Sequence, residues 1–352
     1  MTKQILYIGC YTPNAEAGIK VVEFDNKNGQ LKEVGSSAML SDPSFLVVSK
    51  DRKYLLAVSE NEQQGYLGCF DIKMPITPIF INKQSSLGGA PCHISLNHKN
   101  AFVSNYMTGS VSAFSLTQDK LLPAYQSIQH TGQGRCPDRQ ASAHAHASQL
   151  SVDEKFLVVA DLGIDALKVY DVSENQLNEV FCAYLPAGSG PRHFTFNALG
   201  DKLYLGNELS SEVSVFNFNQ TTGELVHIQS ISSLPQANKP LSGESQGSLE
   251  NSIAEVALSL DGRYLYVSNR GHDSIAIYSV KQSNGLLTAL TFTPSGGLFP
   301  RHFALSPDQQ WLLVAHQKSD YLIVFKRDNE SGFLTKTDEK LAVKHAVCVC
   351  FL

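Results

Sequence analysis

Hydrophobic and polar residues alternate along this chain in short runs, and the runs come in similar groups. In residues 264–278, the apolar run Tyr-Leu-Tyr-Val leads to a polar tip, Asn-Arg-Gly-His-Asp, and then to Ser-Ile-Ala-Ile-Tyr. A period of two is typical of β-strands that bury one face, because successive side chains of a strand point to opposite sides. The 3.6-residue period of helices is hard to find anywhere in the chain. The pattern therefore predicts an all-β protein.

The groups are copies of one repeat. Each copy has an alternating strand, a polar turn, a strongly apolar strand, a polar tip and a third alternating strand; a Gly-x-Leu stretch such as 223–225 then suits a turn into a fourth strand. Six copies begin at Pro43, Pro91, Ala143, Gly190, Asn251 and Phe299. Aligned positions are Ser44, Cys92, His146, Arg192, Ala254 and Arg301, with steps of 48, 54, 46, 62 and 47 residues. Four-stranded units at this spacing are typical of β-propeller blades.

The two chain ends supply a seventh blade. Residues 5–24 resemble a second and third strand without a first, and residues 344–352 resemble a first strand without its sequel. Joining them would pair edges that otherwise stay open. We therefore predict one domain, residues 1–352, folded as a seven-bladed β-propeller with one blade closed by strands from both termini. An all-β sandwich is the alternative, and the matched termini disfavour it.

Composition narrows the class of protein. The chain has 352 residues, 43% of them hydrophobic and 17% charged, with a net charge of −5. No Lys/Arg block is present, so we expect no nucleic-acid partner. No apolar run approaches the roughly 18 residues of a membrane span, and the first ten residues lack the pattern of a signal peptide. The seven cysteines include no Cys-x-x-Cys pair, which favours reduced thiols in a cytoplasmic protein.

Propeller geometry predicts where unusual polar residues meet. The first strand of a blade lies nearest the axis and starts at one rim, and the antiparallel second strand ends at the same rim. Residues at the strand-one starts are His93, His144, His146, Arg192, His193, Glu255, Arg301 and His302. Residues at the strand-two tips are Glu60, Asn105, Asp161, Asn207, Glu208, Asn269, Arg270, His316 and Gln317. We expect these side chains to gather at one mouth of the central channel.

The residue types at this mouth suit the hydrolysis of an anionic molecule. Arginine binds carboxylate and phosphate groups in a bidentate way, so a small anionic ligand is expected. A carboxylate such as Glu208 beside histidines suits general acid–base chemistry. Structural roles stay open, because inner-strand histidines often bond across blades and a lone arginine can be an ion-pair partner. A metal bound by His144 and His146, with Glu208 or Asp161 as third ligand, is a further alternative. No nucleophile elbow, which is a Gly-x-Ser-x-Gly turn between a strand and a helix, is found, and no glycine-rich phosphate loop lies between a strand and a helix.

Several segments resemble a known family. Residues 144–165, 190–209, 261–278 and 299–317 resemble the seven-bladed propeller lactonases, the family of bacterial propeller-type 6-phosphogluconolactonase and fungal carboxy-cis,cis-muconate lactonising enzyme. The resemblance runs from residue 5 to the last strand. It implies a lactone substrate bearing anionic groups, handled without a metal or cofactor. The activity implied is the opening of a phosphorylated sugar lactone in the pentose phosphate pathway.

The resemblance also implies roles for particular residues. It implies catalytic roles for His144, Arg192, Glu208 and Arg270, with His146 as the second candidate for the functional histidine because the match there is ambiguous by two residues. We expect Arg301 and His302 to bind a phosphate or another polar end, and Asn207 and Asn269 to orient their neighbours. The substrate-binding residues expected are His146, His193, Asn207, Asn269, Arg301 and His302.

Two long connections, residues 129–142 and 232–251, are expected to shape the substrate pocket. The alternatives are muconate lactonisation or isomerisation, hydrolysis of another sugar lactone, and a non-catalytic propeller that binds proteins. We expect the partners to be limited to a small anionic lactone, with the protein a monomer or a weak homo-oligomer.

Overall fold

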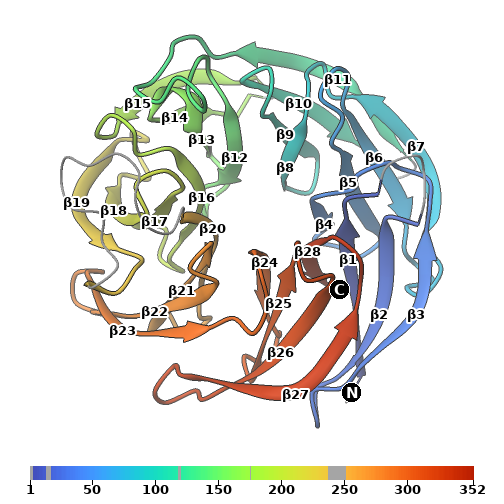
Figure 1. Ribbon diagram of the computed structural model, residues 1–352. Helices are drawn as coiled ribbons and strands as arrows, with labels where there is room; N and C mark the ends of the chain where they lie inside the picture. The colour runs from blue at the N-terminus through green and yellow to red at the C-terminus, as the bar shows by residue number, and fades with distance from the viewer. Residues whose placement is uncertain (1–2, 13–16, 118–119, 175, 237–250) are drawn as a thin grey trace.

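Seven four-stranded antiparallel sheets surround a common axis (Figure 1). The computed structural model describes residues 3–12, 17–117, 120–174, 176–236 and 251–352. The innermost strands contact one another in a ring, each one touching the innermost strand of the two neighbouring blades. The predicted all-β, seven-bladed β-propeller is confirmed.

The blades repeat the same order of strands from the axis outward. The innermost strands are β4 (Leu46–Val48), β8 (Pro91–Leu96), β12 (Ala145–Leu150), β16 (Pro191–Phe196), β20 (Ser252–Leu258), β24 (Pro300–Leu305) and β28 (Ala346–Phe351). The second strands are β5 (Tyr54–Ser59), β9 (Asn100–Asn105), β13 (Phe156–Asp161), β17 (Lys202–Asn207), β21 (Tyr264–Arg270), β25 (Trp311–His316) and β1 (Lys3–Cys10).

The outer half of each blade completes the sheet. The third strands are β6 (Tyr66–Asp71), β10 (Ser110–Leu116), β14 (Ala166–Asp171), β18 (Glu212–Phe218), β22 (Ser274–Val280), β26 (Tyr321–Arg327) and β2 (Ile19–Asp25). The outermost strands are β7 (Ile79–Ser85), β11 (Leu121–Gln129), β15 (Asn178–Tyr184), β19 (Leu225–Ser232), β23 (Leu287–Pro294), β27 (Leu334–Ala342) and β3 (Leu31–Ser37). A turn of 3₁₀ helix, η2 (Leu162–Ile164), follows β13. No helical segment in the described ranges has the length and hydrophobicity that a bilayer span requires.

The first and last strands of the chain close the ring. β28 pairs with β1 in antiparallel register, with Leu6 opposite Phe351 and Gly9 opposite Cys348. β28 is the innermost strand of this sheet and β1 the second, as the truncated repeats at the two chain ends predict. Figure 1 shows the two strands, coloured red and blue, side by side.

A hydrogen-bonded turn between the first two strands recurs in several blades. The Ser259 hydroxyl donates to Asp261 Oδ1 at 2.6 Å and accepts from the backbone N–H of Tyr264 at 3.0 Å. The same serine–aspartate bond closes the turns that begin at Ser49, Ser151 and Ser306. Short polar side chains that bond to nearby backbone favour turns, which explains the polar turn of the repeat.

The innermost strands carry a bulge near their starts. In six blades the pairing register slips there, for example between Pro91 and His93 and between Pro300 and His302. In a regular strand, two consecutive side chains would point to opposite faces. A bulge re-aims one of them, so that consecutive residues such as Arg192 and His193 both reach inward, at two depths along the axis.

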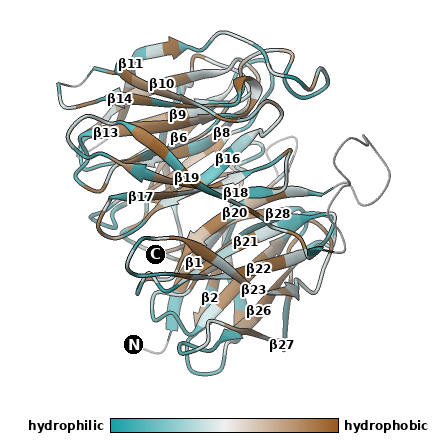
Figure 2. Cartoon of the chain, turned by 90° about the vertical axis from the view of Figure 1, so that its left-hand side faces the viewer, coloured by the Kyte–Doolittle hydropathy of each residue, from teal (hydrophilic) through white to brown (hydrophobic). Residues whose placement is uncertain are grey.

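Apolar residues fill the space between neighbouring blades. The cluster that joins the closing blade to the blade of β24–β27 includes Leu6, Phe24, Leu313 and Val324, all fully buried. Comparable clusters lie between the other neighbouring blades of the described chain. Figure 2 shows the strands largely brown and many of the connecting loops teal. Each blade is therefore stabilised by burial against two others.

We expect Leu6→Ala to lower the free energy of unfolding by about 2–5 kcal/mol, because Leu6 is 0% exposed in the interface that closes the ring. The measurement is urea unfolding followed by tyrosine and tryptophan fluorescence. Leu260→Ala is the matched control, since Leu260 is 76% exposed in a turn; we expect a change within about 0.5 kcal/mol. Equal small effects of both substitutions would show that the N-terminal strand adds little to closure.

Candidate active site

A buried carboxylate surrounded by guanidinium groups forms the centre of the site. Glu208 directly follows β17 and is 3% exposed. Its Oε1 lies 2.7 Å from Arg139 Nη2, and its Oε2 lies 3.1 Å from Arg192 Nε and 2.9 Å from Arg270 Nη2. Burial alone would raise the pKa of Glu208, but the positive charges of Arg270 and Arg192, helped by Arg139, hold it well below its usual range. Glu208 is therefore a permanent anion with three cationic partners.

Two of these arginines are anchored to the backbone of β20, which is the innermost strand of Arg270's own blade and of the blade next to Arg192. Arg192 Nη1 donates to the carbonyl of Ala254 at 2.6 Å, and Arg270 Nη2 donates to the carbonyl of Ile253 at 2.9 Å. Burial lowers the pKa of both arginines, and for Arg192 the nearby charges of Arg270 and Arg301 lower it further. Like charges held together in a buried place favour the arrival of an anion.

His144 is held by backbone and by an aromatic ring. Its Nδ1 lies 2.8 Å from the carbonyl oxygen of Tyr106, and its ring stacks on the Tyr106 ring at 4.6 Å between centroids. A carbonyl can only accept a hydrogen bond, so Nδ1 carries the proton, and Nε2 of the neutral ring carries the lone pair. The backbone N–H of His144 donates to Asp161 Oδ1 at 2.7 Å.

Asp161 in turn belongs to a buried network. It accepts from the N–H of Gly163 at 3.0 Å and lies 2.7 Å from His130 Nδ1. The other ring nitrogen of His130 lies 2.8 Å from the Tyr170 hydroxyl. The network fixes the position of the segment that carries His144. His130 and Tyr170 therefore help to position His144, a role that the repeat pattern did not indicate for either residue.

His146 lies against the central carboxylate. Its Nε2 is 3.8 Å from Glu208 Oε2, and its Nδ1 is 3.8 Å from the Cys92 sulfur. Burial, together with the charge of Arg192, lowers the pKa of His146 well below its usual range. His146 is therefore a neutral ring at neutral pH. His144 and His146 both contact Tyr106, so the structure brings the two candidate histidines to one place.

Arg301 belongs to a separate hydrogen-bonded chain. Its Nη2 donates to the Tyr11 hydroxyl at 2.8 Å, and that hydroxyl donates to Glu60 Oε2 at 3.0 Å. The guanidinium carbon also lies 5.4 Å from the centre of the Tyr11 ring. Burial raises the pKa of Glu60. Tyr11 directly follows the second strand of its blade, the position that Glu60 and Glu208 occupy in theirs. Strand tips were considered only in the six complete repeats of the sequence, so Tyr11 was not singled out.

His193 and His302 lie deeper along the axis and share a different carboxylate. His193 Nδ1 is 2.8 Å from Glu255 Oε2. His302 Nδ1 accepts from the N–H of Val349 at 3.3 Å, so its Nε2 carries a proton and faces Glu255 Oε2 at 3.2 Å. Burial raises the pKa of Glu255 to about 8. The bonds of both histidines therefore go to Glu255 rather than to the groups around Glu208.

Aromatic rings complete this deeper layer. Phe45 packs on His93 at 4.2 Å between ring centroids, and both rings contact His193. Glu255, His93 and Phe45 also line a cavity of about 590 Å³ that is bounded by the far ends of β4, β8, β12 and β20. The deeper layer therefore lies between the Glu208 cluster and the opposite mouth of the channel.

The side chains of Asn207 and Asn269 form hydrogen bonds to nearby serine residues. Asn207 Nδ2 donates to the Ser214 hydroxyl at 2.8 Å. Asn269 Nδ2 donates to the carbonyl of Ser233 at 2.8 Å, and its Oδ1 accepts from the Ser233 hydroxyl at 2.7 Å. Each asparagine directly precedes a charged residue of the site, so these bonds hold the backbone that presents Glu208 and Arg270.

The long connection 129–142 supplies a residue that sequence reasoning missed. Arg139 reaches Glu208 from this segment and also donates to the Tyr106 hydroxyl at 3.3 Å. The length of the connection was the available signal. Most of the second long connection, residues 237–250, lies outside the described residues. In the described ranges, no group of three or more His, Cys, Asp or Glu side chains is arranged to hold a metal ion.

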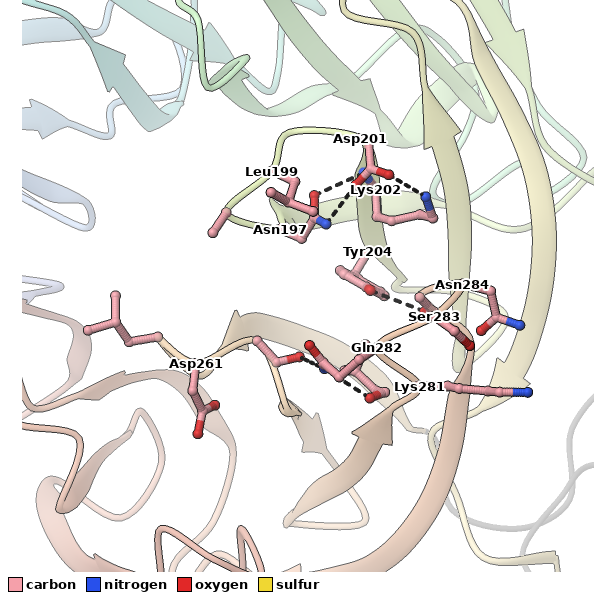
Figure 3. A pocket seen from close by; sticks show the side chains of 15 residues that line it. Asn197, Leu199, Asp201, Lys202, Tyr204, Asp261, Lys281, Gln282, Ser283 and Asn284 are labelled. Atoms are coloured by element: carbon pink, nitrogen blue, oxygen red, sulfur yellow. Dashed lines mark hydrogen bonds and ion pairs between the residues drawn. The ribbon is translucent and has the colours of Figure 1, made fainter.

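A second hollow lies near the turns of two neighbouring blades, away from Glu208. Figure 3 shows this cavity of about 260 Å³, with Asn197, Asp201 and Lys202 on one wall and Gln282 and other loop residues on the other. Its polar groups bond to one another: Lys202 Nζ and Asn197 Nδ2 each lie 2.7 Å from an Asp201 carboxylate oxygen. It has none of the arginines or histidines of the site.

Comparisons relate the chain to known proteins. Residues 5–351 match the family model described as Lactonase, 7-bladed beta-propeller. The chain is 34% identical to a Bacillus subtilis protein named 6-phosphogluconolactonase, over 100% of this chain and 99% of the relative. It is 33% identical to a Formosa agariphila protein of the same name, over 96% of each. The solved structure of a periplasmic gluconolactonase from Pseudomonas aeruginosa is similar with a TM-score of 0.90 and 31% identity, over 99% of each chain.

The deeper layer predicts a pH-dependent stability. A carboxyl group whose pKa is raised on folding, as for Glu255, keeps its proton in the folded state, so it destabilises that state as pH rises from its unfolded pKa toward about 8. Burial lowers the pKa of His93, His193 and His302, so these rings are neutral in the folded state, and their contribution to the pH dependence fades as pH rises above 6.5.

We therefore expect Glu255→Gln to become more stable relative to the wild type between pH 6.5 and 8, by up to about 1 kcal/mol per pH unit. Urea unfolding at several pH values measures the difference, in which the titrations of all other groups cancel. A constant difference across this range would mean that Glu255 is ionised throughout.

Proposed function

The chain belongs to the family of seven-bladed β-propeller lactonases, and we propose that it hydrolyses 6-phosphogluconolactone to 6-phosphogluconate, a step of the pentose phosphate pathway. The observation that carries the proposal is the binding of one buried carboxylate, Glu208, by three guanidinium groups. This arrangement leaves surplus positive charge, which suits an anionic substrate and a negatively charged intermediate. The names of two relatives support the same substrate.

Arg192 and Arg270 are proposed to stabilise the reacting carbonyl. Attack of water on the lactone carbonyl carbon creates a tetrahedral intermediate with a negative oxygen. Donors that are already oriented stabilise such an oxygen without reorganisation. The bonds of the two arginines to Ala254 and Ile253 fix their orientation before substrate binds.

His144 is proposed as the general base. Its Nδ1 proton is committed to the Tyr106 carbonyl, so the Nε2 lone pair is available to take a proton from water. Glu208 is a poor base, because the surrounding arginines hold its pKa low. As the carbon–ring-oxygen bond breaks, the imidazolium returns this proton to the departing oxygen. The new carboxylic acid then ionises, with a net release of one proton.

The remaining site residues are proposed to bind the rest of the substrate. Arg301, which is linked through Tyr11 to Glu60, would bind a polar group of the substrate. His146 would pack beside the reacting centre, while Asn207 and Asn269 keep Glu208 and Arg270 in place. His193 and His302 would form the floor beneath the sugar ring. No cofactor is required by this scheme, since the arginines supply the positive charge.

Hydrolysis of an unphosphorylated sugar lactone is the second candidate. The Pseudomonas aeruginosa neighbour, named as a periplasmic gluconolactonase, favours it. For this chain we propose a cytoplasmic location, because the seven cysteines are free in the structure. We also propose that it acts as a monomer or weak homo-oligomer without a nucleic-acid partner.

The first test follows the disappearance of 6-phosphogluconolactone, generated in situ from glucose 6-phosphate, with a chelator present. We expect the protein to accelerate hydrolysis over the spontaneous rate, and Arg270→Ala to lose about 10²–10³-fold of the enzymatic rate. Arg263→Ala is the matched control, because Arg263 lies on the same blade but pairs with Asp261 in an exposed turn. No acceleration by the wild type would exclude this substrate, and full activity of Arg270→Ala would exclude this site.

A second test separates the two candidate histidines. We expect His144→Ala to lower kcat by about 10²–10⁴-fold and added imidazole to restore part of it, because His144 is only half-buried. His146→Ala should lack this rescue, since His146 is buried against Glu208. Rescue of His146→Ala alone would assign the base to His146 instead.

A further inference from the structure

The charges at the mouth are unevenly balanced. Arg301 is linked through Tyr11 to a carboxylate of its own, Glu60. Around Glu208, by contrast, three guanidinium groups share one carboxylate. The surplus positive charge therefore lies beside Glu208, and an incoming dianion is attracted to this side of the mouth.

Arg139 differs from the other two arginines in how it is held. Its side chain is 41% exposed, against 3% for Arg192 and 6% for Arg270. Arg192 and Arg270 are tied to backbone carbonyls of β20, whereas the bonds of the Arg139 guanidinium go to two side chains, Glu208 and Tyr106. Arg139 can therefore change partners without breaking a backbone anchor, and of the three guanidinium groups around Glu208 it is the most accessible to a dissolved anion.

The backbone beneath Arg139 is firmly placed. Its neighbour Gln140 is fully buried and donates to the carbonyl of Leu162 and to Asp165 Oδ1, each at 2.8 Å. The Gln140 side-chain oxygen accepts from the N–H of Cys136 at 3.0 Å. A cation on a fixed support loses little freedom when it binds a ligand. The segment 129–142 thus presents one exposed guanidinium in a defined position.

We propose that Arg139 binds the phosphate group of the substrate and sets the preference of the site for a phosphorylated over an unphosphorylated sugar lactone. The inference rests on the proposed function and assigns its specificity to one residue. In a six-membered sugar lactone the phosphate-bearing carbon is attached to the carbon that carries the ring oxygen, so the phosphate lies near the bond that breaks. A phosphate offers an arginine two oxygens in a matching geometry, and it can draw the guanidinium from Glu208 Oε1.

The test compares two substrates, 6-phosphogluconolactone and glucono-δ-lactone. We expect Arg139→Ala to lower kcat/KM for the phosphorylated lactone about 10–100-fold, the typical loss of a charge-assisted hydrogen bond, and to lower it for glucono-δ-lactone by a much smaller factor. Arg135→Ala is the matched control, because Arg135 is exposed on the same connection; both activities should stay at the wild-type level. Equal losses on both substrates would overturn the proposal, since Arg139 would then act only by holding Glu208.

The variant Arg301→Ala tests whether the phosphate binds at Arg301 instead of at Arg139. If this variant, rather than Arg139→Ala, removes the preference for the phosphorylated substrate, then the phosphate lies at Arg301 and the proposal is wrong. Arg139→Lys keeps the charge without the fork of two donors, and we expect it to retain part of the preference.

Calorimetric measurement of the binding of the two open-chain products, 6-phosphogluconate and gluconate, tests this inference separately from the proposed activity. We expect the wild type to bind 6-phosphogluconate more tightly than gluconate, and Arg139→Ala to remove most of the difference. If the wild type hydrolyses neither lactone but shows this Arg139-dependent binding, the proposed reaction fails while the phosphate site stands. Equal affinities of wild type and Arg139→Ala for 6-phosphogluconate would overturn the phosphate site.

Discussion

Pairing between the first and last strands is the constraint on which the site depends. The hydrogen bonds of β1 to β28 join the chain ends into one sheet and leave no open position in the ring. Closure also assembles part of the mouth directly. Tyr11 follows β1 in the closing blade, while Arg301 starts the inner strand of the blade on one side and Glu60 follows β5 on the other. Without closure, these three side chains would have no reason to meet, and the chain of hydrogen bonds from arginine to carboxylate would not form.

The bulges of the inner strands then divide the axis into two layers of different chemistry. The outer layer holds buried ions, with Arg192 and Arg270 around Glu208. The deeper layer holds neutral imidazoles, because burial lowers the pKa of His93, His193 and His302. Buried charges cost free energy unless they are paired, so the surplus of guanidinium groups in the outer layer works against folding. A propeller interior, held by apolar contacts between neighbouring blades, can tolerate that cost, and an anionic ligand would offset it.

The sequence was sufficient to predict the propeller architecture and which side chains gather at the mouth of the channel. It was insufficient to predict how deep along the axis each side chain lies and which partner it bonds to. Repeat spacing and the truncated ends predicted the seven blades, and equivalent positions predicted that Arg192, Glu208 and Arg270 meet. The alignment placed Arg192 and His193 at one rim, whereas the bulge sends them to different carboxylates. Arg139 could not be found by any repeat, because it lies in an irregular connection whose course depends on buried bonds of Gln140. Local pattern encodes strands, but irregular backbone is decided by tertiary contacts.

Glu208 is the carboxylate at the centre of the site, and its low pKa makes it a poor proton acceptor. Glu208 faces three guanidinium groups, and its ionised form is stabilised more than burial destabilises it. A general base needs a pKa near the working pH, so in the proposed reaction the role of Glu208 is to hold arginines in place for a developing negative charge. The proposed reaction therefore assigns proton transfer to a histidine, and the tautomer of His144 is set by the backbone carbonyl of Tyr106. In the proposed reaction, charge stabilisation and proton transfer are therefore assigned to different groups, and each depends on backbone that the blade edges position.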